Sequence, residues 1–328
     1  MANKVFVTRK IPDSGIALLK AAGFELVVSE KDGVLTKDEL MGALKKEKYD
    51  GVLCLLTDHI DDEVFNAAGK QCKIFANYAV GFDNIDLKAA RTRNIMVTNT
   101  PGVLTETVAE HTFALMLAIA HRVAEADRFT RAGKYKGWGP ILLLGSDVFG
   151  KTLGIIGLGR IGARVVHHAV RGFDMKVLYY DVQRNENFER EYGAAYRDRI
   201  ETLLPDADFV SIHVPLLEST KHLMNDLRFG MMRNTAYLIN TSRGPIVDEQ
   251  ALLRALRAGT IKGAALDVFE NEPAIEPLLL ELDSILLTPH IASGTIETRE
   301  KMARLAANNL IEALAGRVPP NIVQAGSS

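Results

Sequence analysis

Apolar and polar positions alternate along the first hundred residues in a way that predicts strands separated by helices. Short apolar runs predict five strands, at residues 5–7, 24–28, 52–56, 74–76 and 95–97. The stretches between them carry apolar residues at helical spacing, and we expect helices at residues 16–22, 37–45 and 61–69. Because strands that alternate with helices usually lie parallel, this part of the chain is predicted to form a parallel sheet flanked by helices.

The same alternation begins again after residue 150. Six strands are expected there, at residues 152–156, 177–180, 209–213, 237–240, 264–267 and 285–288, with a helix at 249–258 among those between them. A long helix is predicted at residues 106–122, after Thr105 as a suitable N-cap, and it is placed to cross between two domains. A last helix at residues 295–315 has no strand after it, so we expect it to return the chain to the first domain.

A glycine-rich turn follows the first strand of this second half, with the sequence Gly-Leu-Gly-Arg-Ile-Gly. Gly157 allows a tight turn, Gly159 lets the backbone approach a pyrophosphate, and Gly162 lets the following helix pack closely on the strand. The helix N-terminus offers N–H groups and partial positive charge to the phosphates. Asp181 ends the next apolar segment, where a carboxylate can accept hydrogen bonds from both ribose hydroxyls. This order of strand, turn, helix, strand and acid predicts a dinucleotide-binding domain.

Asp181 also bears on which dinucleotide is bound. A carboxylate accepts a hydrogen bond from a free 2′-hydroxyl but repels a 2′-phosphate, so NAD is favoured over NADP. Arg184 is the one complication, because a nearby cation can accommodate that phosphate. It can equally stack on the adenine or be a solvated charge. With Asp181 in place, we expect NAD, used as NADH in reduction.

Composition excludes several classes of function. The 328 residues are 47% hydrophobic and 24% charged, as in soluble globular proteins, and the net charge of -2 gives no support to nucleic-acid or membrane binding. The N-terminus reads at once as a strand, without the pattern of a signal peptide. The two cysteines, Cys54 and Cys72, make no disulfide framework, so a cytoplasmic location is expected. No Cys/His cluster has zinc spacing, and we predict no metal site.

Three polar side chains follow successive predicted strands in the second half: Arg243, Glu272 and His290. Each alone has a plain structural explanation, as a surface ion pair, an acidic turn or a capped loop. Because the carboxyl ends of parallel strands meet at one edge of the sheet, where ligands of such sheets bind, the three side chains are expected together. An arginine fork suits a carboxylate, and an acid beside a histidine suits proton transfer. The set predicts carboxylate binding coupled to proton transfer.

Several motifs together resemble the D-isomer-specific 2-hydroxyacid dehydrogenase family, and their spelling is nearest to glyoxylate/hydroxypyruvate reductases. They are the glycine-rich turn and residues 81–86, 108–110, 240–248, 265–273 and 287–291. The resemblance implies an α/β fold of two Rossmann-like, doubly wound parallel-sheet domains with a cleft between them. The substrate domain would comprise residues 1–99 plus 290–328, and the dinucleotide-binding domain residues 100–289. Members of the family are usually homodimers joined through the dinucleotide-binding domain.

The resemblance also implies roles for single residues. His290 would be the general acid that protonates the 2-keto oxygen, Glu272 would pair with it and favour its charged form, and Arg243 would hold the substrate carboxylate. Asp267 would hydrogen-bond the nicotinamide carboxamide. Further residues are implied around the ligands: Val80 and Gly81 would offer backbone N–H groups to the carboxylate, and Arg160, Ile161, His213, Val214, Pro215, Thr241 and Ser293 would line the cofactor site.

Other side chains are expected to lie outside the site. His111, His121, His167, His168 and His222 fall on predicted helices or near their ends, away from the expected edge of the sheet. Trp138, in a loop with two glycines, is either a dimer or cleft contact or part of the core, and core packing is the expectation.

The expected function is NAD-dependent reduction of a small 2-keto acid, of the glyoxylate or hydroxypyruvate type, to the D-2-hydroxy acid. D-lactate or 3-phosphoglycerate dehydrogenase is the alternative within the family. An alternative of another class is an NAD-sensing corepressor, because the C-terminal binding proteins resemble this fold and keep the same three residues. Those proteins carry long tails, whereas only a few residues follow Ile322 here.

Overall fold

The computed structural model describes residues 2–323 of the chain, which divide into two compact units. Unit one comprises the residues up to Leu104 and those from Gly294 onward, and unit two runs from Thr105 to Ser293. The C-terminal boundary of unit two lies after residue 293, whereas it was expected after residue 289. Residues 290–293 stay with unit two because the amides of Ile291 and Ala292 donate to the carboxylate of Asp267, at 2.9 and 2.8 Å.

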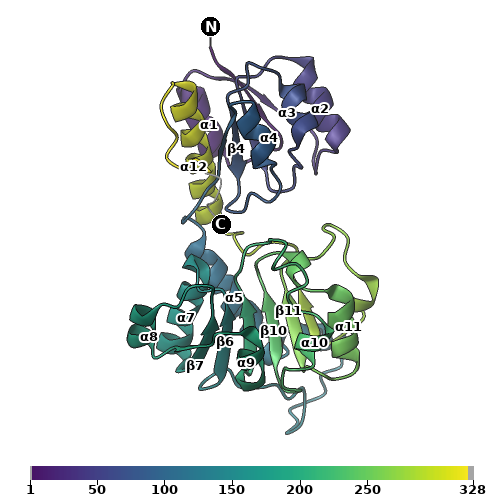
Figure 1. Cartoon of the computed structure of the whole chain (residues 1–328). Helices are drawn as coiled ribbons and strands as arrows, with labels where there is room; N and C mark the ends of the chain where they lie inside the picture. Colours follow the sequence, from purple (N-terminus) through teal and green to yellow (C-terminus); the bar gives the residue numbers. More distant parts are fainter. Residues whose placement is uncertain (1, 324–328) are drawn as a thin grey trace. The chain divides into compact units, whose positions relative to one another are not determined.

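Unit one is a five-stranded parallel sheet with helices on both faces, in the strand order β2-β1-β3-β4-β5 (Figure 1). All five strands expected from the apolar runs are present. The strands are β1 Lys4–Val7, β2 Glu25–Val28, β3 Gly51–Leu55, β4 Ile74–Tyr78 and β5 Met96–Thr98; the helices are α1 Asp13–Ala21, α2 Lys37–Lys46, α3 Asp62–Ala68, α4 Leu87–Thr92 and α12 Ile296–Leu314.

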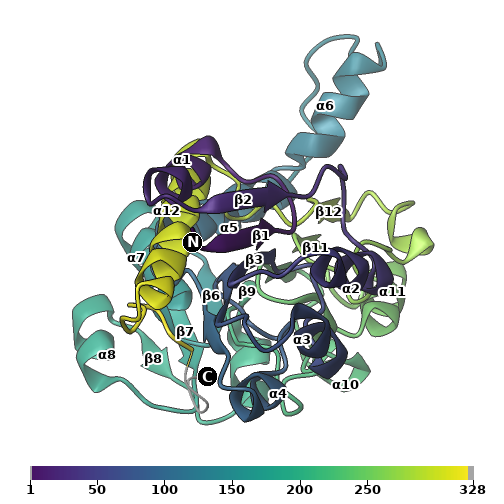
Figure 2. The same cartoon turned by 90° about the horizontal axis from the view of Figure 1, so that it is seen from above.

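The helices of unit one cover the two faces of its sheet as separate groups. Helices α1 and α12 lie side by side, and α12 packs along β3 and β4 as expected for a helix that returns the chain (Figures 1 and 2). On the other face, α2, α3 and α4 enclose a core that includes Phe6, Leu40, Phe65 and Phe75. Helix α4 was not expected, because six residues are too few to show helical spacing.

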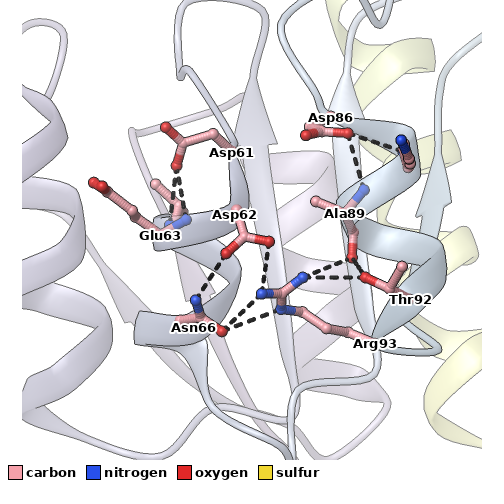
Figure 3. Close-up of polar contacts among 10 residues, drawn as sticks. Asp61, Asp62, Glu63, Asn66, Asp86, Ala89, Thr92 and Arg93 are labelled. Atoms are coloured by element: carbon pink, nitrogen blue, oxygen red, sulfur yellow. Dashed lines mark hydrogen bonds and ion pairs between the residues drawn. The ribbon is translucent and has the colours of Figure 1, made fainter.

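Local capping explains where two of these short helices begin (Figure 3). Asp61 accepts from the amides of Glu63 and Val64 at the start of α3, and Asp86 caps α4 in the same manner. The guanidinium of Arg93 then donates to the side chain of Asn66, at 2.9 Å from Nη2, and joins the end of α4 to α3.

Unit two is a seven-stranded parallel sheet in the order β12-β11-β10-β9-β6-β7-β8. The six expected strands are present, and the two-residue strand β8 is an additional edge strand. The strands are β6 Thr152–Ile156, β7 Lys176–Tyr180, β8 Ala195–Tyr196, β9 Phe209–Ile212, β10 Tyr237–Asn240, β11 Gly263–Leu266 and β12 Ile285–Leu287; the helices are α5 Thr105–Ala120, α6 Val123–Arg131, α7 Arg160–Phe173, α8 Glu186–Tyr192, α9 Ile200–Leu203, α10 Asp226–Phe229 and α11 Glu249–Arg257.

The order of the strands places a switch point between β6 and β9. The chain moves outward from β6 to β7 and β8, and then returns to add β9 to β12 on the other side. Helices α5 and α7 pack on one face, around Phe113 and Val165, whereas α9, α10 and α11 pack on the other, around Phe229 and Leu252. In open α/β sheets a ligand binds outside the carboxyl ends of the strands at such a point.

The long helix expected at residues 106–122 is divided in two. Helix α5 ends at Ala120 because Arg122 has a left-handed backbone conformation, with φ of 54°, and α6 starts at the next residue. Helix α6 and the loop after it extend away from the sheet of unit two (Figure 2). The expectation of core packing for Trp138 was wrong, since its side chain in this loop is 84% exposed. Within residues 2–323, no helix is long and apolar enough to cross a membrane.

Candidate active site

The glycine-rich turn of unit two is shaped by two glycines that admit no side chain. Gly157 has φ of +98°, and a Cβ there would lie 2.8 Å from the carbonyl carbon of His213. A Cβ at Gly162 would overlap the carbonyl oxygen of Gly157. The turn therefore brings the start of α7 close against the end of β6 and the segment after β9.

Gly159 differs from its two neighbours, because a Cβ there would meet no atom within 4 Å. It is the N-cap of α7, and within the described chain no side chain caps this helix N-terminus. Helix N-terminal amides beside open space form an anion site, so the turn fits the pyrophosphate of a dinucleotide.

Asp181, directly after β7, faces this turn. Its Oδ2 accepts from the amide of Leu158 at 2.7 Å, and its Oδ1 accepts from the amide of Gln183 at 3.0 Å. An ionised carboxylate has about four acceptor positions, so two remain for the hydroxyls of a ribose. The distance from Asp181 to Leu158 places an acid beside the site that fits the phosphates.

Arg243 follows β10 in a segment that is fixed on both sides. The side chain of Asn240 donates to the carbonyl of Arg243 at 2.9 Å and accepts from the amide and hydroxyl of Ser242 at 3.0 and 2.8 Å. A Cβ at Gly244 would overlap the carbonyl of Phe269, so this glycine permits direct backbone contact with the segment after β11. The half-buried Arg243 side chain donates to the carbonyl of Ser242 at 2.8 Å.

Glu272 and His290 form a pair in which each member is held separately. The Nδ1 atom of His290 lies 2.8 Å from Oε2 of Glu272, while Oε1 of Glu272 accepts from the amide of Phe269 at 3.0 Å. His290 has a left-handed backbone, with φ of 54°, and its amide donates to the carbonyl of Asp267 at 2.8 Å. Because Nδ1 faces Glu272, Nε2 is the ring nitrogen left to act on a ligand.

Asp267 is fully buried at the end of β11 and collects four donors. They are the hydroxyl of Thr288 at 2.6 Å, the amides of Ile291 and Ala292, and Nε2 of His111 at 3.4 Å. Burial alone would raise the pKa of Asp267, but these hydrogen bonds outweigh it and hold the pKa below its usual value.

His111 was not expected at this edge of the sheet. Its Nε2 lies 3.2 Å from Oγ1 of Thr288 as well as near Asp267, because α5 packs across β10, β11 and β12. No signal in the sequence distinguishes it from a solvated helical histidine, since the face that α5 presents to the strands depends on the tertiary fold.

The segment after β9 supplies another histidine to the expected cofactor site. Nε2 of His213 lies 2.8 Å from the hydroxyl of Ser211, and burial lowers the pKa of His213 to about 3, so the imidazole is neutral at physiological pH. Val214 approaches Gly157, and Thr241 is buried with its hydroxyl 3.0 Å from that of Thr112. Pro215 is exposed and Ser293 half-buried.

The expected site residues of unit two therefore all follow the carboxyl ends of strands β6, β7 and β9 to β12. Val80 and Gly81 lie in unit one, after the end of β4. Their carbonyls accept from the side chains of Asn99 at 2.7 Å and Asn77 at 2.9 Å.

Comparison with known proteins gives a family match within unit two and relatives over nearly the full length. The family model described as "D-isomer specific 2-hydroxyacid dehydrogenase, NAD binding domain" matches residues 113–292, which lie in unit two. A glyoxylate reductase of Korarchaeum cryptofilum is 51% identical over 326 residues, covering 98% of this chain and 96% of that protein. The chain belongs to the D-isomer-specific 2-hydroxyacid dehydrogenase family. It is an oxidoreductase with a domain for a nicotinamide dinucleotide, as the motifs predicted.

Solved structures share this fold over nearly the full length of the chain. A protein from Thermus thermophilus is 42% identical with a TM-score of 0.91, over 98% of this chain and 100% of that one. An NADPH-dependent glyoxylate/hydroxypyruvate reductase from Sinorhizobium meliloti, solved with NADP and malonate, is 30% identical with a TM-score of 0.85, over 98% and 97% of the two chains. The α/β fold with two Rossmann-like domains is thus confirmed.

Proposed function

We propose that this dehydrogenase reduces a small 2-keto acid, of the glyoxylate or hydroxypyruvate type, to the D-2-hydroxy acid with NADH. The observation that carries the proposal is the His290–Glu272 pair at 2.8 Å, on the sheet edge that also presents Arg243 and the glycine-rich turn. Relatives named glyoxylate reductase, 51% and 48% identical to the chain, support a small substrate.

When bound, the nicotinamide dinucleotide supplies the hydride. His290 donates the proton from Nε2 to the keto oxygen, because its Nδ1 faces Glu272. Glu272 holds the ring in this orientation by accepting at Oε2 from Nδ1. Arg243 binds the substrate carboxylate and stabilises the negative charge that grows on the keto oxygen. The amides of Val80 and Gly81 in unit one are proposed as further donors to the carboxylate.

The cofactor is proposed to be NAD rather than NADP. Asp181 places a carboxylate next to the amide of Leu158 in the turn that fits the phosphates, so a 2′-phosphate on the adjoining ribose would meet negative charge. Gly157, Gly159, Arg160, Ile161 and Gly162 would hold the pyrophosphate. His213, Val214, Pro215, Thr241, Asp267 and Ser293 would line the remainder of the dinucleotide.

We further propose that the protein is a homodimer joined through α6 and the loop after it. This segment carries exposed apolar side chains that include Trp138, Ile141, Leu144 and Phe149, of which Trp138 and Ile141 are more than 80% exposed. A second copy of the segment would cover them, because exposed apolar groups gathered on one projection are typical of an interface.

The first test is oxidation of NADH and of NADPH with glyoxylate, hydroxypyruvate, pyruvate, phenylpyruvate and 3-phosphohydroxypyruvate. Turnover with NADH on glyoxylate or hydroxypyruvate is expected. Preference for pyruvate or the phosphorylated acid would instead support a lactate or phosphoglycerate enzyme. Binding of NADH without turnover on any acid would favour the corepressor alternative.

Single variants then test the roles of the three residues. His290→Ala and Arg243→Ala are each expected to lower turnover by about 100-fold or more, while the dissociation constant for NADH changes little. His121→Ala is the matched control, because His121 is exposed at the end of α5. Unchanged turnover in either site variant would contradict the assigned role.

A further inference from the structure

We propose that Glu189 is a positioning residue that sets coenzyme specificity, because it holds Arg184 away from the ribose 2′-position and so disfavours NADP. The inference deepens the proposed function and rests on the dinucleotide site at Asp181. Arg184 lies three residues after Asp181, in the turn between β7 and α8.

Glu189 engages Arg184 through two parallel hydrogen bonds. Nε of Arg184 donates to Oε1 and Nη2 donates to Oε2, both at 2.8 Å. In this geometry the Nε and Nη2 donors on one edge of the guanidinium are already used, and they are not available to bind a phosphate. Arg184 is the expected complication to NAD specificity, and in the structure its charge is already paired.

Glu189 is itself anchored to the sheet. The hydroxyl of Tyr179, a fully buried residue of β7, donates to Oε1 of Glu189 at 2.8 Å and accepts from the amide of Asn185 at 2.8 Å. The Glu189 side chain is only 16% exposed, whereas that of Arg184 is 54% exposed. The hydrogen bonds from Arg184 lower the pKa of Glu189 to about 2, so the carboxylate stays charged at physiological pH.

The paired guanidinium of Arg184 and the backbone of Asp181 share one neighbour, the side chain of Tyr196. Arg184 is placed over the ring of Tyr196, with Cζ 5.8 Å from the ring centroid, and the Tyr196 hydroxyl donates to the carbonyl of Asp181 at 3.3 Å. The side chain of Tyr196 therefore contacts both the guanidinium of Arg184 and the backbone of Asp181. Arg184 is the cationic residue nearest to Asp181 in the sequence. If it were released from Glu189, its charge would offset the repulsion between Asp181 and a 2′-phosphate.

The test compares Glu189→Gln with the unaltered chain by direct titration with NADH and NADPH. Glutamine keeps an oxygen that accepts from Tyr179, so the turn retains this bond while the negative charge is lost. We expect the ratio of the NADPH to NADH dissociation constants to fall about fivefold, as expected when a competing ion pair of ordinary strength is removed. Glu186→Gln is the matched control, because Glu186 lies 3.9 Å from Arg184 at a single atom pair; its ratio should not change.

A double variant decides whether Arg184 is the agent. Adding Arg184→Leu to Glu189→Gln is expected to restore the original ratio. Two results would overturn the inference while leaving NADH binding and the proposed function intact. One is an unchanged ratio of the NADPH to NADH dissociation constants in Glu189→Gln. The other is tighter NADPH binding that persists in the double variant. Titration needs no turnover. If the unaltered chain failed to bind NADH, that result would instead count against the proposed function itself.

Discussion

Nε2 of His222 lies 2.6 Å from Oε1 of Glu270, and this contact joins the two segments that carry Arg243 and Glu272. The amide of His222 donates to the carbonyl of Pro245 at 2.8 Å, two residues after Arg243. Glu270 stands two residues before Glu272. His222 was expected to lie away from the site, yet it holds the segments on which two of the proposed catalytic residues stand.

Removing the His222 ring should therefore disturb the chemistry without removing a group that acts in it. For His222→Leu we expect turnover with the keto acid to fall about tenfold or more, because small misplacements of reacting groups are costly. The dissociation constant for NADH should stay within a factor of about two. His222→Gln, which can still donate to Glu270, should recover part of the loss. Equal turnover in both variants and the unaltered chain would refute this coupling.

Two glycines of the same turn should respond differently to alanine. Gly159→Ala meets no atom within 4 Å and has an ordinary backbone, so the melting temperature should hold while NADH binds more weakly. Gly162→Ala forces a Cβ onto the carbonyl of Gly157 and should destabilise unit two by about 3 kcal/mol. Thermal unfolding and NADH titration of both variants check this; similar melting temperatures would contradict it.

The lowered pKa of Asp267 predicts a specific pH dependence of stability. A carboxyl whose folded pKa is below its unfolded value stabilises the fold above about pH 4, and this contribution is lost as pH falls through the folded pKa. Asp267→Asn should therefore be less stable than the unaltered chain near pH 7, with a difference that shrinks below about pH 4. Urea unfolding from about pH 2.5 to 7 measures it, and a difference that does not vary with pH would contradict the prediction.

The exposed apolar segment after α6 predicts the state of assembly. Trp138→Ser combined with Ile141→Ser should convert a dimer into monomers in sedimentation, because it removes the two most exposed large apolar groups of that loop. Leu227→Ser is the control, since Leu227 is also 69% exposed but lies on α10. A chain that is monomeric before any substitution would refute the dimer.

Much of the fold, and the edge of the sheet that carries the candidate site, could be predicted from the sequence for one physical reason. Strands buried on both faces are short apolar runs, and the residues that follow them must lie at the carboxyl edge of a parallel sheet. Arg243, Glu272 and His290 were placed at this edge in this way, and the structure has each of them after the end of a strand. The turn at Gly157 was found because glycine alone tolerates its backbone conformation.

The features that the sequence did not predict depend on tertiary contacts and on how loops are placed in the fold. His111 reaches the distant Asp267 only because α5 crosses three strands. The sequence allowed three roles for Arg184. Its ion pair with Glu189, five residues later, joins a turn to α8, so the spacing rules for pairs within one helix do not predict it. Trp138 was assigned to the core because its size favours burial, and a projecting loop overrides that preference.

The interleaving of the two units has a consequence for the order in which the chain matures on the ribosome. Unit two is continuous from Thr105 to Ser293, so all of its strands are available before α12 has been synthesised. Unit one needs α12 to cover β3 and β4, with Leu310 packed where Gly51 leaves room and Tyr78 bonded to the carbonyl of Arg299. The first hundred residues must therefore wait with the part of the sheet that α12 covers still exposed, and the domain that begins first is the one that finishes last.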